Sequence, residues 1–545
     1  MLITDILIRN AALFPDDTAL VELNPELREK EAPNWREFEL VEPDSFHPAY
    51  RKELNWFDFN ARANQVANLL RSNDYRKGDK VAILLMNCLE WLPIYFGVLK
   101  AGCVAVPINF RNSTDEIAYC LELADVSGLL FGPHFTQRLV PIADKLPRNA
   151  FFVGDEDAPE FAEDYYAAVA LQSDILERAE LTSDDEAAIY FSSGTTGFPK
   201  AILHLHRALY FSAVVEQAHH RQTRDDVFLC IPPLYHTGAK MHWFGSLLSA
   251  SKAVILRGTK PEWILEAASS ERASIVWLLV PWAQDILDAI DSGAVDITKL
   301  SLERWRLMHI GAQPVPRSLV KRWLTVFPHH DYDTNYGLSE SIGPGCVHLG
   351  LGNIHKVGAI GRPGFGWETK ITDEAGNTLP SGQVGELQVK GDGVMRCYYR
   401  DSEASDAVLP GDGWLRTGDM AEIDDDGFIW LVDRKKDVII TGGENLYPVQ
   451  IEDFLRANDK IKDVAVIGIA DPRLGEIAAA IIELKPGQTV ADGEIEEFCL
   501  GLPRYKRPHK FLFSEVPRNA TGKIEKPKLR ALYNSTNLVE QTILG

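Results

Sequence analysis

The sequence predicts an α/β protein with layered sheets, a β-rich segment after them and a small α+β unit at the C-terminal end. Short apolar runs alternate with helical stretches over residues 60–280, the pattern of sheets buried between helices. Shorter strands separated by turns follow at 385–389 and 427–431. The 545 residues exceed what one hydrophobic core usually supports, and an apolar content of 46% is ample for burial. We therefore expect a large N-terminal domain and a smaller C-terminal one.

The expected elements follow one another in a regular order. Helical stretches are expected at 60–71 and 91–101, and apolar, β-prone runs predict strands at 81–85, 103–108, 128–131, 187–191 and 274–280. Two more strands, 464–469 and 478–484, belong to the small α+β unit. We place the domain boundary at Asp433 to Lys436, which gives domains of residues 1–432 and 433–545.

The charge of the chain is unevenly distributed. A formal net charge of −22 argues against a general nucleic-acid-binding or anionic-membrane surface. Residues 501–530 nevertheless hold nine basic residues against two glutamates, so this segment forms a basic island in an acidic protein. The island suggests a docking place for phosphate-bearing molecules. A solvated helix face is the alternative for Lys526, Lys528 and Arg530, and it explains residues 504–507 less well.

Apolar runs and cysteines indicate the compartment. No uncharged apolar run approaches the roughly 18 residues of a membrane span, and residues 1–10 lack the pattern of a secretory signal. The cysteines are scattered and contain no Cys-x-x-Cys pair, which favours buried thiols in a reducing compartment. We therefore expect a cytoplasmic protein without an integral membrane segment. The cysteines are Cys88, Cys103, Cys120, Cys230, Cys346, Cys397 and Cys499.

Residues 190–200 form the most informative segment of the chain. They follow the predicted strand at 187–191 and combine hydroxyl side chains, two glycines and a terminal lysine. Glycines let the backbone turn its N–H groups inward as an anion-binding nest, so the segment suits a polyphosphate. Its spacing does not fit the Walker loop, and a flexible surface turn is the alternative. The residues concerned are Ser192, Ser193, Gly194, Thr195, Thr196, Gly197 and Lys200.

Four more blocks follow in order: 336–340 (Tyr-Gly-Leu-Ser-Glu), 414–419 (Trp-Leu-Arg-Thr-Gly-Asp), 433–437 running into 442–445, and 519–523 (Asn-Ala-Thr-Gly-Lys). Together with the loop they resemble the signatures of the adenylate-forming enzymes, which include acyl-CoA synthetases, adenylation domains of peptide synthetases and luciferases. The resemblance spans nearly the whole chain. It implies a small, mobile C-terminal domain, and it marks residues 28–55 as an insertion of unknown role.

The resemblance implies that a carboxylate attacks the α-phosphorus of ATP, giving an acyl-adenylate and pyrophosphate. Because an anion must approach a polyanion, charge-stabilising groups matter most. By resemblance, Thr195, Thr196 and Lys200 hold the β- and γ-phosphates, and Glu340 with Thr196 holds Mg²⁺. Ser339 stands where the family usually has threonine, and it retains the hydroxyl.

Further residues are assigned to the nucleoside by the same resemblance. Tyr336 would stack on adenine, with Asn335, Gly337 and the turn of Gly311, Ala312 and Gln313 beside the ring. Asp419 would accept the ribose hydroxyls, and Arg434 would support it. Taken alone, Asp419 could equally be a turn residue and Tyr336 a core aromatic.

The C-terminal blocks are assigned to the two half-reactions. Lys523 would neutralise charge between the carboxylate and the α-phosphate, with an ordinary surface lysine as the alternative. Rotation of the small domain about Lys436 would then bring Gly442, Gly443 and Glu444 to the active site, where the pantetheine arm of coenzyme A passes.

The acyl pocket is less readable. Residues 233–238 resemble the family's Pro-x-x-His segment, with His236 beside the acid where relatives that activate amino acids carry aspartate. An amino-acid substrate is therefore disfavoured. Lys240 and His242 either meet a polar group on the acid or face away from the pocket. Three residues are candidates for the wall of an apolar or cyclic substrate, namely Trp277, Val280 and Trp282.

The sequence thus predicts an ATP- and Mg²⁺-dependent acid–CoA ligase that forms acyl-CoA, AMP and pyrophosphate, with fatty acid metabolism as its setting. An acyl-AMP ligase that loads a carrier protein is one alternative, and a non-catalytic nucleotide-binding or scaffold protein is another. The expected partners are a small carboxylic acid, ATP and coenzyme A, with no nucleic acid. The acid is not specified, and a homodimer is left open.

Overall fold

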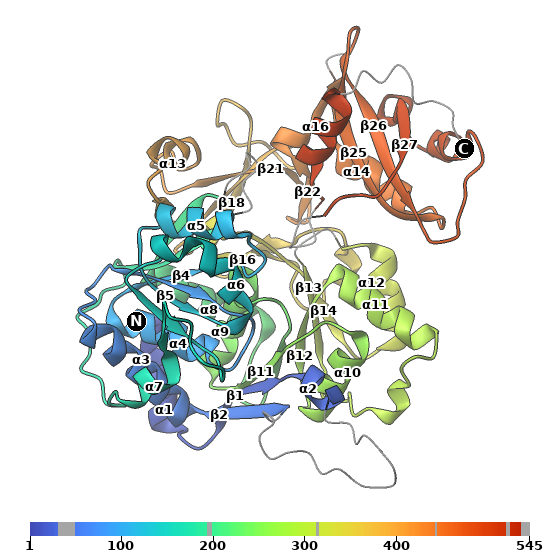
Figure 1. Cartoon of the computed structure of the whole chain (residues 1–545). Coiled ribbons are helices and arrows are strands. Elements are labelled where there is room, and N and C mark those ends of the chain that lie inside the picture. Colours follow the sequence, from blue (N-terminus) through green and yellow to red (C-terminus); the bar gives the residue numbers. More distant parts are fainter. Residues whose placement is uncertain (31–49, 193–198, 312–314, 442–443, 519–523, 536–545) are drawn as a thin grey trace. The chain divides into compact units, whose positions relative to one another are not determined.

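A computed structural model describes residues 1–30, 50–192, 199–311, 315–441, 444–518 and 524–535 (Figure 1). Contacts divide the chain into two compact units. The first unit comprises residues 1–368 and 389–415, and the second comprises 369–388 and 416–545. Each unit has its own sheets, and each is described separately below.

A seven-stranded sheet forms one layer of the first unit. Its neighbouring strands pair in parallel except at one edge, where β2 is antiparallel to β1. The strand β2 ends the polar segment at 28–55, so its last residues belong to this sheet. In order, the strands are β14 (Asp331–Asp333), β13 (Leu307–Gly311), β12 (Ile275–Leu279), β10 (Val227–Cys230), β11 (Lys252–Leu256), β1 (Thr18–Leu23) and β2 (Arg51–Asn55).

An eight-stranded sheet forms a second layer. Most of its strands are parallel, but β8 and β9 pair antiparallel, so the segment between them is a hairpin connection. This connection is the predicted phosphate loop. In order, the strands are β20 (Cys397–Tyr398), β9 (Ala201–Leu205), β8 (Glu186–Phe191), β4 (Val104–Pro107), β3 (Lys80–Leu84), β5 (Val126–Phe131), β6 (Asn149–Phe152) and β7 (Glu163–Asp164).

Helices pack between and around these sheets. Helix α8 contacts β8 and β9 of the larger sheet, whereas α9 contacts β10 and β11 of the other, so this helix pair lies between the layers. Every residue of α4 is buried. Figure 1 shows α10, α11 and α12 on the other side of the seven-stranded sheet. The helices are α1 (Ile3–Leu13), α2 (Pro25–Lys30), α3 (Trp56–Ser72), α4 (Trp91–Ala101), α5 (Thr114–Leu123), α6 (Thr136–Leu139), α7 (Tyr165–Ala170), α8 (His206–His220), α9 (Thr237–Ser249), α10 (Pro261–Ser270), α11 (Val280–Asp291), α12 (Arg317–Val326) and α13 (Ser402–Val408).

A short three-stranded sheet completes the first unit and carries the second predicted motif. It consists of β15 (Asn335–Leu338), β16 (Gly343–His348) and β17 (Arg362–Pro363), and a 3₁₀ turn, η4 (Ser339–Ser341), connects the first two strands. Residues 336–340 therefore span a strand and the turn that follows it.

The predicted α/β class is confirmed, and most expected elements lie where the pattern placed them. The helix expected at 91–101 has those bounds, and its C-terminal cap is Gly102 in the left-handed region, with φ 86°. The strand expected at 274–280 is shorter, because Val280 and Pro281 already begin α11. Proline is favoured at the start of a helix, where its missing N–H has no partner to lose.

The second unit contains most of a four-stranded sheet and a five-stranded sheet. The first has the order β18 (Glu368–Thr372), β19 (Gly385–Lys390), β21 (Leu415–Ile423) and β22 (Ile429–Arg434). The second contains β24 (Glu444–Leu446), β23 (Ile439–Thr441), β26 (Gly475–Leu484), β25 (Ile461–Asp471) and β27 (Lys510–Phe513). Its helices are α14 (Pro448–Arg456), α15 (Glu494–Phe498) and α16 (Lys526–Ser535).

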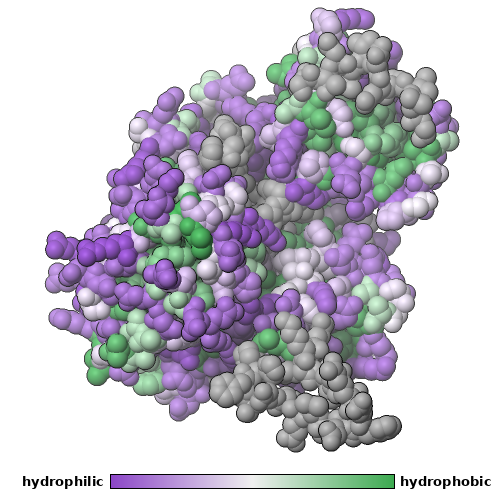
Figure 2. Space-filling model, viewed as in Figure 1, coloured by the Kyte–Doolittle hydropathy of each residue, from purple (hydrophilic) through white to green (hydrophobic). Residues whose placement is uncertain are grey.

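The surface and the thiols agree with the composition. Figure 2 shows mostly hydrophilic residues on the visible face of the first unit, with hydrophobic ones in small areas. Among the helices of the described ranges, none has the length and apolar character needed to cross a membrane. Burial raises the pKa of the thiols of Cys103, Cys120 and Cys230 to about 12, so these thiols remain protonated and unreactive.

Candidate functional site

The predicted phosphate loop begins and ends on paired strands. Phe191 of β8 lies opposite Ala201 of β9, and the Ser192 N–H donates to the Lys200 carbonyl at 3.1 Å. The loop between them includes Ser193, Gly194, Thr195, Thr196 and Gly197, which lie outside the described residues. The two ends of the loop are thus fixed by the sheet.

Tyr398 joins this loop to the predicted Mg²⁺ carboxylate. The Lys200 Nζ lies 4.6 Å from the centroid of the Tyr398 ring, and the Tyr398 hydroxyl donates to Glu340 Oε1 at 2.9 Å. Strand β20 places Tyr398 next to β9, because Tyr398 pairs with Ile202. Burial, and then the neighbouring Glu340, raise the pKa of Tyr398, so its hydroxyl stays a neutral donor. We call Lys200, Tyr398 and Glu340 the lysine–glutamate cluster.

A second contact fixes the turn that carries Glu340. The Nε2–H of His204, on β9, donates to the Ser339 carbonyl at 2.7 Å. The Met395 N–H donates to the Glu340 carbonyl at 2.8 Å. The phosphate loop and the turn that carries Glu340, some 140 residues apart in sequence, are therefore connected through β9 and β20. Neither Tyr398 nor His204 belongs to a sequence motif, so neither contact could be predicted.

The residues predicted to surround adenine also come together. Tyr336 is 8% exposed and lies opposite Val347 in the β15–β16 pair. Gly311 ends β13, and a Cβ added to it would stand 3.6 Å from Asn335 Oδ1. Gly337 follows on β15. Ala312 and Gln313 lie outside the described residues.

His236 caps the helix next to this region. Its Nδ1 accepts the Gly238 N–H at 3.2 Å at the start of α9, so the proton of a neutral ring is on Nε2. A Cβ at Gly238 would lie 3.4 Å from the Trp277 ring. Trp277 in turn stacks on His242, with ring centroids 4.6 Å apart. The predicted wall residue Trp277 is thus adjacent to the predicted acid-facing segment.

Lys240 and His242 point to different places. Lys240 is fully buried, and its Nζ lies over the rings of Trp91, Tyr95 and Tyr190 at 5.3, 4.9 and 4.4 Å. Burial there lowers the pKa of Lys240 well below its ordinary value. His242 instead meets Asn335, whose Nδ2 lies 2.9 Å from its Nε2. Of the two, His242 is the one beside a predicted site residue.

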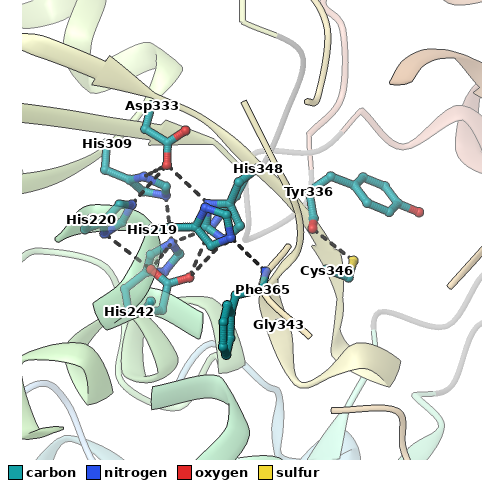
Figure 3. Close-up of polar contacts among 12 residues, drawn as sticks. His219, His220, His242, His309, Asp333, Tyr336, Gly343, Cys346, His348 and Phe365 are labelled. Atoms are coloured by element: carbon teal, nitrogen blue, oxygen red, sulfur yellow. Dashed lines mark hydrogen bonds and ion pairs between the residues drawn. The ribbon is translucent and has the colours of Figure 1, made fainter. Parts of the chain in front are cut away.

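His242 belongs to a buried group of imidazoles and carboxylates (Figure 3). In the figure, His220, His309 and His348 surround the Asp333 carboxylate. Burial raises the pKa of Glu216 to about 8, whereas, against the effect of burial, hydrogen bonds from His220 and His348 hold the pKa of Asp333 well below its usual range. No local motif announces this group, which we call the histidine cluster, because its members come from five elements. They are Glu216, His220, His242, His309, Asp333 and His348.

Asp419 and Arg434 are paired in the second unit. They lie opposite each other on β21 and β22, and Arg434 Nε is 3.4 Å from Asp419 Oδ1. Asp419 is 6% exposed and follows Gly418, whose φ of 72° lies in the left-handed region. The two predicted ribose residues are therefore in contact.

The remaining predicted residues are only partly described. Lys436 lies in the 3₁₀ turn η6 (Lys435–Asp437), and burial lowers its pKa. Glu444 begins β24 opposite Thr441. Gly442, Gly443 and Lys523 lie outside the described residues.

Several residues of the basic island have acidic partners. Arg518 pairs with Asp463 at 2.5 Å and Arg530 with Asp437 at 2.8 Å. Lys526 is 7% exposed and pairs with Glu452 at 2.8 Å. The solvated-face alternative is therefore wrong for Lys526.

Comparisons with known proteins identify the family. The model of the AMP-binding enzyme family matches residues 9–399, and that of the AMP-binding enzyme C-terminal domain matches residues 450–523. The long-chain-fatty-acid–CoA ligase FadD13 of Mycobacterium tuberculosis is 31% identical, over 90% of this chain and 95% of its own. The crotonobetaine/carnitine–CoA ligase of Salmonella paratyphi A is 30% identical, over 88% and 93%.

Solved structures agree over the whole length. ATP-bound MatB from Rhodopseudomonas palustris has a TM-score of 0.85 at 26% identity and covers 98% of this chain and 99% of its own. The anthranilate CoA ligase AuaEII, in complex with anthranoyl-AMP, has a TM-score of 0.84 at 25% identity, with 98% and 97% covered. The predicted resemblance and reaction class are confirmed: the chain belongs to the AMP-binding enzyme family, as an acid–CoA ligase that uses ATP, Mg²⁺ and coenzyme A.

Proposed function

We propose that the lysine–glutamate cluster is the phosphate end of the adenylation site. The observation that carries this is the shared contact with Tyr398, which brings the cation of Lys200 and the carboxylate of Glu340 to one ring. A single carboxylate oxygen beside phosphate oxygens is a donor set that Mg²⁺ accepts. When bound, the ion would neutralise phosphate charge, and Lys200 would hold the γ-phosphate end in place.

The acid and the nucleoside are assigned to further residues. Tyr336 offers its ring to adenine, with Asn335 and Gly311 beside it, and His236 borders the carboxylate. Asp419 accepts the ribose hydroxyls, and Arg434, 3.4 Å away, orients that carboxylate. Ser192, Thr195 and Thr196 supply hydroxyl donors to the phosphates.

The C-terminal residues divide the two half-reactions. Lys523 stabilises the charge that builds up between carboxylate and α-phosphate. The segment from residue 433 then rotates at Lys436, and Gly442, Gly443 and Glu444 line the path of the pantetheine arm. The exposed Arg504 and its neighbours in residues 504–510 supply positive charge for the phosphates of coenzyme A.

We further propose a cytoplasmic enzyme of acyl metabolism. The seven thiols agree with a reducing compartment. The relatives act on acids as different as long-chain fatty acids and crotonobetaine or carnitine by name, so the acid must be found by experiment. Analytical ultracentrifugation will decide between a monomer and a homodimer.

A panel of acids tests the proposal. Short, medium, long, aromatic and alicyclic acids are each supplied with ATP and Mg²⁺, and pyrophosphate and acyl-CoA are measured separately with and without coenzyme A. We expect both products for at least one acid. Pyrophosphate without acyl-CoA would indicate an enzyme that loads a carrier protein, and neither product with any acid would contradict the catalytic assignment.

Lys523→Ala separates the first half-reaction from the second. Loss of one charge-stabilising donor typically costs on the order of 10²-fold or more, so acyl-AMP formation should fall by that factor. Transfer from preformed acyl-AMP to coenzyme A should be much less affected. Equal damage to both steps would contradict the role given to Lys523.

Lys436→Pro gives the opposite separation. Proline fixes φ near roughly −65° and blocks backbone rotation at this position. Acyl-AMP should still form, while thioester formation should fall by orders of magnitude. Quenched single turnovers measure the two products, and normal transfer in the variant would place the hinge elsewhere.

A further inference from the structure

The histidine cluster presents a set of metal-ligand atoms that the adenylation reaction does not use. His220 lies at the end of α8, His309 on β13 and Asp333 on β14. The side chains of all three are 0% exposed. One ligand atom from each, namely His220 Nε2, His309 Nδ1 and Asp333 Oδ2, lies within 4.8 Å of the others. Figure 3 shows them converging from separate elements.

The distances fit a single small cation. Asp333 Oδ2 is 3.1 Å from His220 Nε2 and 3.7 Å from His309 Nδ1. Zinc binds imidazole nitrogen and carboxylate oxygen at about 2.0–2.2 Å, which puts two ligands of one ion roughly 3–4 Å apart. Imidazole with carboxylate is also a donor set that suits zinc better than Mg²⁺ or Ca²⁺.

The proton positions show which nitrogen of His309 is available. His242 Nδ1 lies within hydrogen-bonding distance of the Gly238 carbonyl, which can only accept, so Nδ1 carries the proton of the neutral ring. His242 Nε2 is then an acceptor. His309 Nε2, which is 2.7 Å away, must donate to it.

His309 Nδ1 is consequently a lone pair that faces a carboxylate. It has no hydrogen-bond partner among the described residues, and Asp333 Oδ2 stands 3.7 Å away. Two acceptors turned toward each other in a buried site are unfavourable unless a positive charge lies between them. A metal ion supplies that charge and bonds to both.

Each candidate ligand also has a polar group on the side away from the proposed ion. The other nitrogen of His220, Nδ1, is 3.4 Å from Glu216 Oε2, and that of His309 donates to His242. The Gly350 N–H donates to Asp333 Oδ1 at 2.9 Å. Metal-binding histidines commonly donate their second N–H to a carboxylate or similar group, which fixes the ring.

The charges of the cluster point the same way. Glu216 and Asp333 are two fully buried carboxylates. Within the described ranges, their ion-pair partners are all histidines and include no lysine or arginine. Buried charges are normally paired or coordinate metals. A divalent cation bound to Asp333 would supply the counter-charge that no lysine or arginine of the described residues provides.

We propose that His220, His309 and Asp333 bind a zinc ion, with Glu216 and His242 orienting the two imidazoles. The ion ties the end of α8 to the middle of β13 and the end of β14. Asn335 and Gly311 lie directly beside these ligands, so the site braces the backbone next to the predicted adenine position. This zinc site is separate from the Mg²⁺ assigned to Glu340, and it does not depend on that assignment.

Elemental analysis of the full-length, untagged protein tests the proposal. After growth with zinc and exhaustive dialysis, mass spectrometry of the metals should give about one zinc per chain. A strong chelator should remove the zinc and lower the midpoint of thermal unfolding, and added Zn²⁺ or Co²⁺ should restore it. Cobalt should also give the visible absorption of a nitrogen- and oxygen-ligated ion.

Variants locate the ion. Asp333→Asn and His309→Gln should abolish stoichiometric zinc, while Glu216→Gln should weaken binding by roughly 10- to 100-fold, as loss of an outer partner does. His206→Gln is the matched control, since His206 is a fully buried histidine at the other end of α8. It should keep its zinc.

Two results would overturn the proposal. The first is a wild-type protein that holds no zinc after zinc supplementation and whose unfolding midpoint does not respond to Zn²⁺ or Co²⁺. The second is equal zinc content in wild type, Asp333→Asn and His309→Gln. If the ligand variants fail to fold, chelation and metal restoration of the wild type still decide the question.

Discussion

The lysine–glutamate cluster and the histidine cluster both gather charge in the first unit, but they differ in burial and in balance. Lys200 and Glu340 are half-buried, carry opposite charges and both contact Tyr398. The histidine cluster is fully buried and contains two carboxylates with histidines as their partners. A half-buried pair can exchange water for the charges of a substrate at little cost, whereas a fully buried carboxylate such as Asp333 needs a permanent counter-charge. The first arrangement suits a substrate site and the second a resident ion.

Glu340→Gln tests the substrate side of this comparison and should have the largest effect. The amide keeps the shape and still accepts the Tyr398 hydroxyl, but it removes the charge. Loss of a group that stabilises the transition state typically lowers kcat by about 10²- to 10³-fold. Acid-dependent pyrophosphate release at saturating ATP, and thermal unfolding without ligands, are the measurements.

The unfolding midpoint of Glu340→Gln should stay close to wild type, because the carboxylate is half-buried. Glu368→Gln is the control, since Glu368 is an exposed carboxylate 3.4 Å from Lys390. It should change neither quantity. A large loss of stability with unchanged turnover in Glu340→Gln would reverse the comparison and make this cluster structural.

Tyr398→Phe should have a smaller effect on the same cluster. It keeps the ring under Lys200 and removes only the hydrogen bond to Glu340 Oε1. A hydrogen bond to a charged group contributes about 1.5–3 kcal/mol, so a loss of at least roughly tenfold in kcat/KM is expected. The loss should appear mainly in the KM for Mg²⁺ and ATP, because the hydroxyl positions a carboxylate and does not react.

The neighbouring Tyr399→Phe is a matched control for Tyr398→Phe. Its hydroxyl is not part of the cluster, and the ring that lies 5.3 Å from Lys80 is retained. If both variants lose activity equally, the effect belongs to the strand and not to the hydrogen bond.

The two clusters also differ in how far the sequence predicts them. Lys200 and Glu340 each lie in a run of neighbouring residues with a recognisable order, so their roles could be expected before their contact was seen. Tyr398 could not, because a tyrosine on a two-residue edge strand carries no local sign of a partner 58 residues away. Contacts of this kind depend on how β20 aligns with β9, and that alignment is a property of the assembled sheet.

The histidine cluster shows the same limit more strongly. Its members span residues 216 to 348, and apart from Glu216 and His220, four residues apart on α8, they share no spacing. Only the packing of α8 and α9 against β13, β14 and β16 brings them together. The fold itself was more accessible, since apolar runs mark the strands of both sheets. Even there, the strand predicted at 274–280 includes Val280, which is the first residue of α11, because apolar character continues where the helix begins.

Lys100 offers a third case, a buried cation with neutral partners. It lies on α4 and is 5% exposed, and its Nζ donates to Asn64 Oδ1 at 2.8 Å and to Asn60 Oδ1. In the described part of the chain, no carboxylate forms an ion pair with it. Burial, and then the nearby Arg178, lower the pKa of Lys100 to about 7 from an ordinary 10.5.

This shift predicts a dependence of stability on pH with a definite sign. Between about pH 7 and 10.5 the unfolded chain holds a proton on Lys100 that the folded chain has released. Stability therefore rises with pH across this window, by at most about 1.4 kcal/mol per pH unit. Lys100→Met, which cannot titrate, should lose this contribution and should be less sensitive to pH than wild type between pH 7.5 and 9.5.

Thermal unfolding of the whole protein at several pH values measures the difference in stability between wild type and Lys100→Met. Lys145→Met, a substitution of an exposed lysine, is the control and should follow wild type. A difference that does not change with pH would mean that Lys100 stays protonated when buried. In that case hydrogen bonds to the two asparagines alone would offset the cost of burying the charge. The absence of an ionic partner for a buried charge could then no longer be used to distinguish a structural cluster from a substrate site.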